Sequence, residues 1–236
     1  MEVSIGMKNW QPTIQNTVKT MADKGTKKII CLFMSPFSTR ATAQSYKCSV
    51  LQAVNNLPEK METHFVPSWH THSLYIDALC EKVKEGLSLF PSGRRPFVEI
   101  IFSAHSLPLS TVKDDPYVDQ IKATISVLMQ RLKNSKWHLA FQSRGQKGEK
   151  WLSPDTEDLL KTLARQGTKE VLSVPIGFVS DHLETLYDLD IFLKKKADDL
   201  GLQYQRTPSL NESPKFIEAL THFILLPLEQ TDRELS

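Results

Sequence analysis

The sequence lacks a long apolar run, is poor in cysteine and carries almost no net charge. No apolar stretch approaches the roughly 18 residues needed to cross a bilayer, and the opening "MEVSIGMKNW" lacks the basic-then-apolar pattern of a signal peptide. Lysine and arginine number 29 against 27 acidic residues, and a net charge of +2 offers nucleic acid no electrostatic attraction. We therefore expect a soluble, cytoplasmic protein without a nucleic-acid partner.

The three cysteines, Cys31, Cys48 and Cys80, are an odd number without CxxC spacing. This pattern indicates reduced thiols and argues against a structural zinc or iron–sulfur site. Cys31 and Cys80 lie in apolar segments and are expected to act as small core residues. The sequence also contains no GxGxxG, P-loop or GxSxG motif, which weighs against nucleotide binding and nucleophile-elbow hydrolysis.

What the sequence does contain is a regular alternation of short apolar runs and amphipathic segments. This alternation predicts an α/β protein, with parallel sheets covered by helices on both faces. The apolar runs predict strands at 26–34, 98–104, 137–143 and 169–178, and the spacing of apolar residues predicts helices at 12–24, 73–90, 117–132 and 154–167.

The clearest break in the pattern is "FPSGRRP", at 90–96, which concentrates turn formers and charge. We expect a domain boundary there, with a first unit over 1–93 and a second over 94–206. The polar tail over 227–236 is expected to fray. The first unit is short for a complete doubly wound layer.

Polar residues follow the apolar strands, where open parallel sheets bind their ligands. All four strand tips are expected at one edge. His105 ends the run "VEIIFSAH" and is either a packed structural histidine or a proton acceptor and metal ligand. Ser180 is a plausible N-cap for a helix that would carry Asp181, Glu184 and Asp188 on one stripe. That stripe is either a solvated acidic face or a path for a cation or protons, and His105 with Glu184 would suit the second task.

Five segments, in order, resemble the ferrochelatase family, whose members insert ferrous iron into a porphyrin. They are "FSAHSLP" with "DDPY", "FQSRGQKGEKWLSPDTEDLL", "VPIGFVSDHLETLYDLDI" and "SLNESPKFIEAL". "GMKNWQPTI" and "SPFSTRATAQSY" resemble earlier segments of the family more loosely. The resemblance implies a chelatase-like fold of two Rossmann-like units, the first one incomplete, with a C-terminal helix at about 214–226 that packs back on the first unit.

The resemblance also implies roles for individual residues. His105 and Glu184 would lie on opposite sides of the porphyrin as catalytic residues and metal ligands, and Asp188 would continue an acidic path. Lys8 would pair with a porphyrin propionate, and Ser106, Phe178 and Trp151 would contact the porphyrin, Trp151 being equally plausible as a core residue. Ferrous iron and porphyrin would be substrates. No cofactor would be bound permanently, and the sequence lacks the cysteine-bearing extension that holds an iron–sulfur cluster in some members.

Several positions depart from the family pattern. Phe192 stands where many members continue the acidic path, Lys8 where arginine is usual and Asn9 where tyrosine or histidine is usual. "DDPYV" replaces "GDPYP", and a long N-terminal portion with the porphyrin-covering lip has no counterpart. We expect iron insertion into protoporphyrin IX rather than coproporphyrin, giving haem b. The alternatives are a non-catalytic porphyrin- or haem-binding derivative and a structural remnant of the fold. Oligomeric state and peripheral contact with a membrane or another haem-pathway enzyme stay open.

Overall fold

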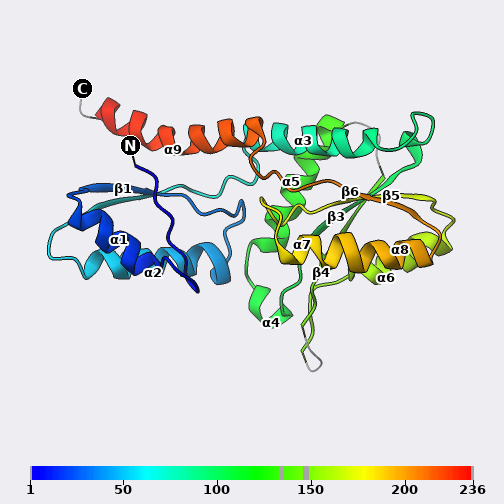
Figure 1. Ribbon diagram of the computed structural model, residues 1–236, viewed down its shortest axis with the longest axis horizontal. Helices are drawn as coiled ribbons and strands as arrows, with labels where there is room; N and C mark the ends of the chain where they lie inside the picture. The colour runs from blue at the N-terminus through cyan, green and yellow to red at the C-terminus, as the bar shows by residue number, and fades with distance from the viewer. Residues whose placement is uncertain (1, 133–135, 146–148, 235–236) are drawn as a thin grey trace. The chain divides into compact units, whose positions relative to one another are not determined.

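The structure is a computed structural model that describes residues 2–132, 136–145 and 149–234 (Figure 1). The chain forms two compact units, one made of residues 1–68 and 220–236 and the other of residues 69–219. Each unit contains a parallel sheet with helices packed against it. The predicted α/β class is therefore confirmed.

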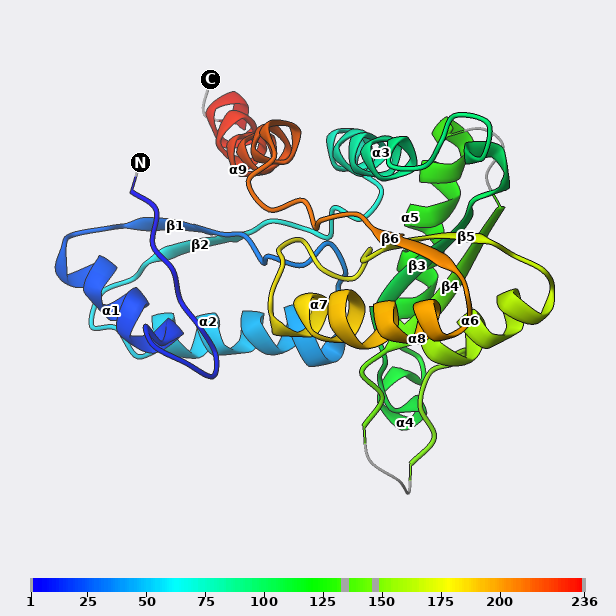
Figure 2. The ribbon, with the colours of Figure 1, turned by 45° about the vertical axis from the view of Figure 1, so that its right-hand side comes forward.

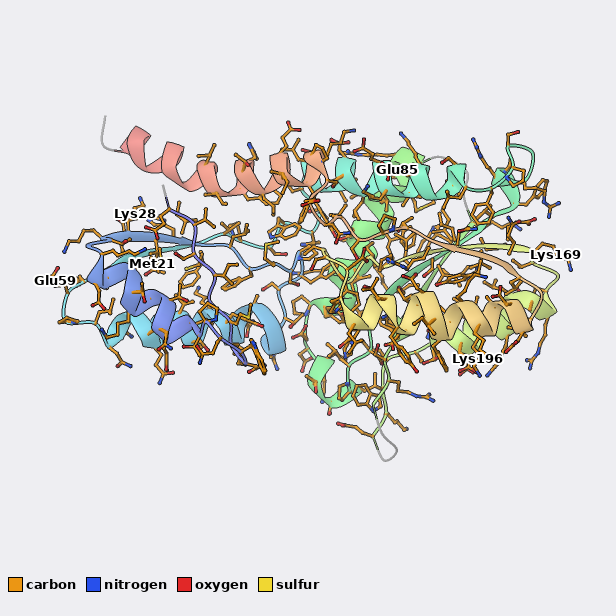
Figure 3. All side chains as sticks on the ribbon, viewed as in Figure 1. Met21, Lys28, Glu59, Glu85, Lys169 and Lys196 are labelled. Carbon is orange, nitrogen blue, oxygen red and sulfur yellow. The ribbon has the colours of Figure 1, made fainter. Side chains whose placement is uncertain are left out.

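The first unit is built on two parallel strands, β1 (Lys28–Cys31) and β2 (Glu62–Phe65). Helices α1 (Ile14–Asp23) and α2 (Ser45–Asn55) lie on the same face of this pair in both views (Figures 1 and 2), and the π-helix η1 (Arg40–Gln44) leads into α2. Met21 points from α1 into the space below β1 (Figure 3). The small core joins these elements through Ile14, Val18, Ile29, Val50, Ala53 and Met61.

The second unit has a four-stranded parallel sheet in the order β4-β3-β5-β6. Helices α3 and α5 cover one face, and α6 and α8 cover the other (Figures 1 and 2). The strands are β3 (Glu99–His105), β4 (Lys136–Gln142), β5 (Glu170–Val174) and β6 (Gln203–Arg206). The helices are α3 (Ser73–Ser88), η2 (Arg95–Phe97), α4 (Leu109–Val112), α5 (Tyr117–Leu132), α6 (Thr156–Arg165), α7 (Leu183–Leu186), η3 (Asp188–Leu193) and α8 (Lys194–Asp199).

Strand β3 occupies the centre of this sheet because it is apolar on both faces. Its residues are buried from Glu99 to Ala104, and only the terminal His105 is partly exposed. The neighbouring strands β4 and β5 both pair with it in parallel register. On the face covered by α6 and α8, Lys196 of α8 (Figure 3) forms an ion pair with Glu157 of α6 at 3.3 Å, which links these two helices. Because β3 is buried up to Ala104, its position in the sheet determines where the partly exposed His105 side chain lies.

The boundary between the units falls between residues 68 and 69, rather than at the expected position between 93 and 94. Helix α3 belongs to the second unit because it packs against α5 and β5. The fit is close: a Cβ on Gly86 would lie 2.8 Å from the Leu172 side chain. The turn at 90–96 resembles a linker in sequence, but Arg94 forms a two-pronged hydrogen bond with the buried Glu170, at 2.6 and 2.8 Å. This turn is a surface element of the second unit.

The C-terminal helix α9 (Pro214–Glu234) is longer than the sequence predicts. The expected frayed tail over 227–236 is instead helical as far as Glu234, and 235–236 lie outside the described residues. The first turns belong to the second unit, where Phe216 packs on Trp69 with ring centroids 5.9 Å apart, and only the part from Leu220 onward groups with the first unit. Among the described residues no helix, α9 included, is long and apolar enough to span a membrane.

The cysteines are placed largely as the sequence predicts. Cys31 lies in β1, and burial raises the pKa of its thiol to about 11, so this thiol is protonated and unreactive at neutral pH. Cys80 is buried in α3, and burial again raises the pKa of its thiol. Cys48, by contrast, is exposed on α2. Cys31 and Cys80 therefore act as small core residues.

Candidate functional site

The carboxyl ends of the four strands of the second unit share one edge because all the strands are parallel. We call this the C-edge and the opposite edge the N-edge. The expectation that all four predicted tips share one edge is confirmed for the three strands of this sheet. It is wrong for the strand predicted at 26–34, because β1 belongs to the separate sheet of the first unit.

His105 and Glu184 meet at the C-edge. Nδ1 of His105 lies 2.9 Å from Oε2 of Glu184, and the two side chains are 34% and 41% exposed. The carboxylate lies off the direction of a hydrogen bond from the ring, and in the described part of the chain Nδ1 has no other aligned partner. The pair is thus close enough for a charge interaction, and although Nδ1 itself is buried, both side chains are about one third or more exposed.

Two contacts fix the backbone around His105. The Tyr117 hydroxyl donates a hydrogen bond to the His105 carbonyl oxygen at 3.1 Å. Burial, with the nearby carboxylates of Asp115 and Glu184, raises the pKa of Tyr117, so its hydroxyl remains a donor at every physiological pH. On the other side, the backbone N–H of Gly177 donates to Ser103 at 3.2 Å. A Cβ on Gly177 would lie only 2.9 Å from the Cα of Ala104, so the loop after β5 needs glycine there to reach β3.

Glu184 lies on α7, which begins later than the sequence predicts. The N-cap is His182, not Ser180, and its backbone N–H donates a hydrogen bond to the Thr185 hydroxyl at 2.9 Å. Asp181 therefore precedes the helix, and the predicted stripe of three carboxylates reduces to Glu184 and Asp188. The helix then widens into the π-helix η3 at Asp188. Insertions of this kind are frequent at functional sites.

The end of β4 holds both remaining carboxylate residues in place. The Gln142 side chain donates a hydrogen bond to the Glu184 carbonyl oxygen at 3.1 Å, and the Ser143 hydroxyl donates to the Asp188 carboxylate. Ser143 adopts a positive φ of 59° directly after the strand. Sequence reasoning singled out neither residue, although both belong to the "FQSRG" tip that it placed at this edge.

Asp181 has a different environment from the other two acidic residues. Its carboxylate accepts hydrogen bonds from Arg206 at 2.8 Å, from the Asn211 side chain at 2.9 Å and from the Ser209 backbone at 3.2 Å. Burial alone would raise the pKa of Asp181, but the hydrogen bonds from Asn211 and Ser209 and the charge of Arg206 outweigh it, and the pKa is lowered. Asp181 is thus an ionised structural carboxylate, contrary to its expected place on the stripe.

Three further predicted residues lie at the C-edge in different surroundings. The Ser106 side chain is buried, and its hydroxyl donates to the Leu152 carbonyl at 3.2 Å. The Phe178 ring packs on the His182 ring with centroids 4.6 Å apart. Trp151 forms a β-bridge with Pro108 and covers Gly145, and its buried Nε1 has no hydrogen-bond partner among the described residues.

Lys8 belongs to the first unit, whereas the other predicted residues belong to the second. Its ammonium group donates a hydrogen bond to the Ser45 hydroxyl and lies 6.0 Å from the centre of the Tyr46 ring. The predicted contact of Lys8 with a porphyrin propionate therefore stays a prediction.

The metal-binding capacity of the C-edge is limited to one imidazole and one carboxylate in direct contact, His105 and Glu184. Across the described residues, no group of three or more His, Cys, Asp and Glu side chains is arranged to hold a metal ion. An imidazole nitrogen with a carboxylate oxygen suits borderline divalent cations such as Fe²⁺ and Zn²⁺.

The fold matches solved chelatases. SirB from Bacillus subtilis with Fe³⁺ superimposes with a TM-score of 0.67 at 11% identity, covering 98% of this chain and 86% of that one. The sirohydrochlorin chelatase SirB from Bacillus subtilis subspecies spizizenii in complex with cobalt gives a TM-score of 0.65 at 9% identity, covering 92% and 76%. Identities this low show the fold alone. The chain is a protein of the chelatase fold, as expected.

Sequence comparison narrows this class to one family. The ferrochelatase family profile matches residues 1–226. The ferrochelatase of Geotalea daltonii is 43% identical over 222 residues, which cover 93% of this chain and 69% of that protein. The ferrochelatase of Deinococcus radiodurans is 35% identical over 227 residues, covering 95% and 72%. The chain belongs to the ferrochelatase family, and the resemblance of its motifs is confirmed.

Proposed function

We propose that this chain inserts ferrous iron into a porphyrin, with protoporphyrin IX as substrate and haem b as product. The observation that carries the proposal is the contact between His105 and Glu184, 2.9 Å apart at the C-edge of a ferrochelatase-family chain. In this reaction two pyrrole N–H bonds break, two protons leave and one Fe²⁺ becomes bound to the ring nitrogens, without oxidation or reduction. The protein must therefore accept protons and present a divalent ion.

His105 is proposed to accept the pyrrole protons. A neutral imidazole is a suitable base near neutral pH, and the Glu184 carboxylate beside Nδ1 offsets the positive charge that forms on the ring. The bond from Tyr117 to the His105 carbonyl and the close approach of Gly177 fix the strand end, so the ring meets the substrate in one position. The relatives named ferrochelatase support iron insertion as the reaction.

Glu184 and Asp188 are proposed to carry protons away or to deliver the metal. They lie four residues apart on one helical segment, and Asp188 is oriented by the Ser143 hydroxyl. One turn further on is Phe192, whose ring lies 5.3 Å from the Lys196 ammonium group. The proposed path therefore ends at Asp188, one turn shorter than in many members of the family.

Anaerobic spectrophotometry of the purified chain with protoporphyrin IX and ferrous iron tests the proposal. We expect porphyrin fluorescence to fall as haem forms, and His105→Ala to abolish this change. The matched control is His138→Ala, because His138 forms another histidine–glutamate contact in the same sheet, with Glu99 at 3.0 Å. Its turnover should stay near that of the unchanged chain.

The other possible results separate the alternatives. A saturable shift of the porphyrin spectrum without metal insertion would favour a non-catalytic porphyrin- or haem-binding derivative. The absence of any shift would favour a structural remnant. Protoporphyrin and coproporphyrin should be compared side by side. The cytoplasmic location, the lack of a permanently bound cofactor and the absence of an iron–sulfur cluster stay predictions.

A further inference from the structure

The segment that carries Glu184 and Asp188 is bracketed by two other aspartates. Asp181 lies just before α7, and Asp190 lies within η3. Neither belongs to the proposed path, because both carboxylates bind the same arginine, Arg206, the last residue of β6.

Arg206 uses its whole guanidinium group in these contacts. Nε and Nη2 donate to the two carboxylate oxygens of Asp190, the latter at 2.7 Å, and Nη1 donates to Asp181 at 2.8 Å. Nη1 also donates to the Thr207 carbonyl at 2.9 Å. The Arg206 side chain is only 9% exposed and that of Asp181 19%, so this bond is partly shielded from water, whereas Asp190 is 37% exposed. The bidentate geometry of the Asp190 pair and the two carboxylates on one guanidinium group distinguish these contacts from a single surface pair.

The arginine itself is anchored to the sheet. Arg206 pairs with Ser173 in the register of β5 and β6, and β5 pairs with the strand that ends at His105. A continuous set of hydrogen bonds thus runs from the sheet, through the Arg206 guanidinium group, to Asp181 before Glu184 and to Asp190 after Asp188. From β4, the Gln142 side chain also donates a hydrogen bond to the Glu184 carbonyl oxygen of this segment.

We propose that Arg206 is a positioning residue, which fixes the Glu184–Asp188 segment against the sheet at the distance from His105 that metal insertion requires. The part of this proposal that concerns metal insertion rests on the proposed function. The part that concerns how Arg206 holds the segment does not. Lysine could not replace this arginine. The planar guanidinium group donates to both oxygens of one carboxylate and also to a second carboxylate, and a single ammonium group cannot reproduce that geometry.

The chain supplies a matched control at the N-edge of the same sheet. Arg94 forms the same two-pronged pair with Glu170, the first residue of β5, and Glu170 is nearly buried. Arg206→Gln and Arg94→Gln therefore each remove one bidentate arginine–carboxylate pair, with Asp190 and with Glu170 respectively. A merely structural role predicts similar consequences for both variants.

The test combines amide hydrogen exchange, read by mass spectrometry, with steady-state metal insertion. We expect Arg206→Gln and Arg206→Lys to speed exchange across 183–193 about 10-fold, and Arg94→Gln to leave it unchanged. Turnover should fall about 10- to 100-fold in both Arg206 variants, with the KM for porphyrin little changed. In Arg94→Gln, turnover should equal that of the unchanged chain.

Equal exchange across 183–193 in the Arg206 and Arg94 variants would overturn the positioning role, as would unchanged turnover in Arg206→Gln or full turnover in Arg206→Lys. If the unchanged chain fails to insert metal, the proposed function is wrong. The exchange measurement then still decides whether Arg206 holds the segment.

Discussion

The two edges of the second sheet carry the same kinds of residue pair in opposite settings. Strand β3 begins at Glu99, which bonds to His138 of β4 at 3.0 Å, and ends at His105, which contacts Glu184 at 2.9 Å. At the N-edge the Glu99 side chain is 11% exposed and Lys136 also approaches it, at 3.4 Å. At the C-edge both partners are more than one third exposed and the contact is not an aligned hydrogen bond.

The difference shows that residue type alone does not identify a site. The N-edge pair joins adjacent strands and satisfies a buried carboxylate, which is a structural task. The C-edge pair joins a strand to a helical segment, and its buried Nδ1 has no aligned hydrogen-bond partner among the described residues. The C-edge is also where open parallel sheets bind ligands. There Tyr117 and Gly177 contact the end of β3, and Gln142 donates a hydrogen bond to the Glu184 carbonyl.

Replacing the two glutamates should give opposite results. Glu184→Gln is expected to lower the rate of metal insertion by about 100-fold or more, with little change in the free energy of unfolding, because it removes the charge of the partly exposed carboxylate that contacts the proposed base, His105. Glu99→Gln should leave turnover per folded molecule unchanged and lower the free energy of unfolding by about 1–3 kcal/mol, because at this buried position the neutral amide replaces a charged acceptor paired with His138 and Lys136. Urea unfolding would measure the stability of both variants, and steady-state kinetics would measure their turnover. Equal turnover in the two variants would contradict the functional difference between the C-edge and N-edge pairs.

Gly177→Ala should disturb the C-edge through packing alone. The new Cβ would lie 2.9 Å from the backbone of Ala104, and such overpacking costs about 1–3 kcal/mol. A glycine with free space around it, Gly93, provides the control, since a Cβ there meets nothing within 4 Å. Thermal unfolding should separate the two variants, and a Gly177→Ala protein as stable as Gly93→Ala would contradict the close approach.

Asp188→Asn should have a smaller effect than Glu184→Gln. The substitution retains a hydrogen-bond acceptor for Ser143 but removes the charge of the proposed path, so we expect turnover to fall about 10-fold. The control is Asp198→Asn, which alters an exposed aspartate paired with Lys194 on α8. Turnover equal to that of this control would exclude Asp188 from the path.

The smallest effect concerns acid stability. The folded-state pKa of Asp181 lies below its ordinary value of 3.8, so its ionised form stabilises the fold above that value, and the contribution is lost as pH falls through the folded pKa. The difference in free energy of unfolding between the unchanged chain and Asp181→Asn should therefore be largest near neutral pH and shrink below about pH 4. Urea unfolding at a series of pH values would check this. A difference that widens in acid would contradict the assignment.

The long apolar and amphipathic segments could be predicted from the sequence because their signals are local. The helix predicted at 117–132 has those bounds in the structure, and the run that ends at His105 is the central strand. The family motifs also singled out the two residues that the fold brings together at the C-edge, His105 and Glu184. Their catalytic roles stay predictions.

What the sequence could not show depends on contacts between distant residues. The strands β2 and β6, "ETHF" and "QYQR", are short and polar, so they lack the apolar pattern of a central strand. Arg206 finds its partners 16 and 25 residues earlier in the chain, which no local pattern predicts. The turn at 90–96 was mistaken for a domain boundary because its composition is that of a linker, whereas Arg94 ties it to Glu170.

Anaerobic metal insertion by His105→Ala and His138→Ala, measured side by side with protoporphyrin IX and ferrous iron, tests the central claim most directly. Both variants remove an imidazole that contacts a glutamate on the same sheet, one at each edge. The account predicts that turnover is lost in His105→Ala and retained in His138→Ala. Turnover that survives in His105→Ala, or is lost equally in both, would contradict it.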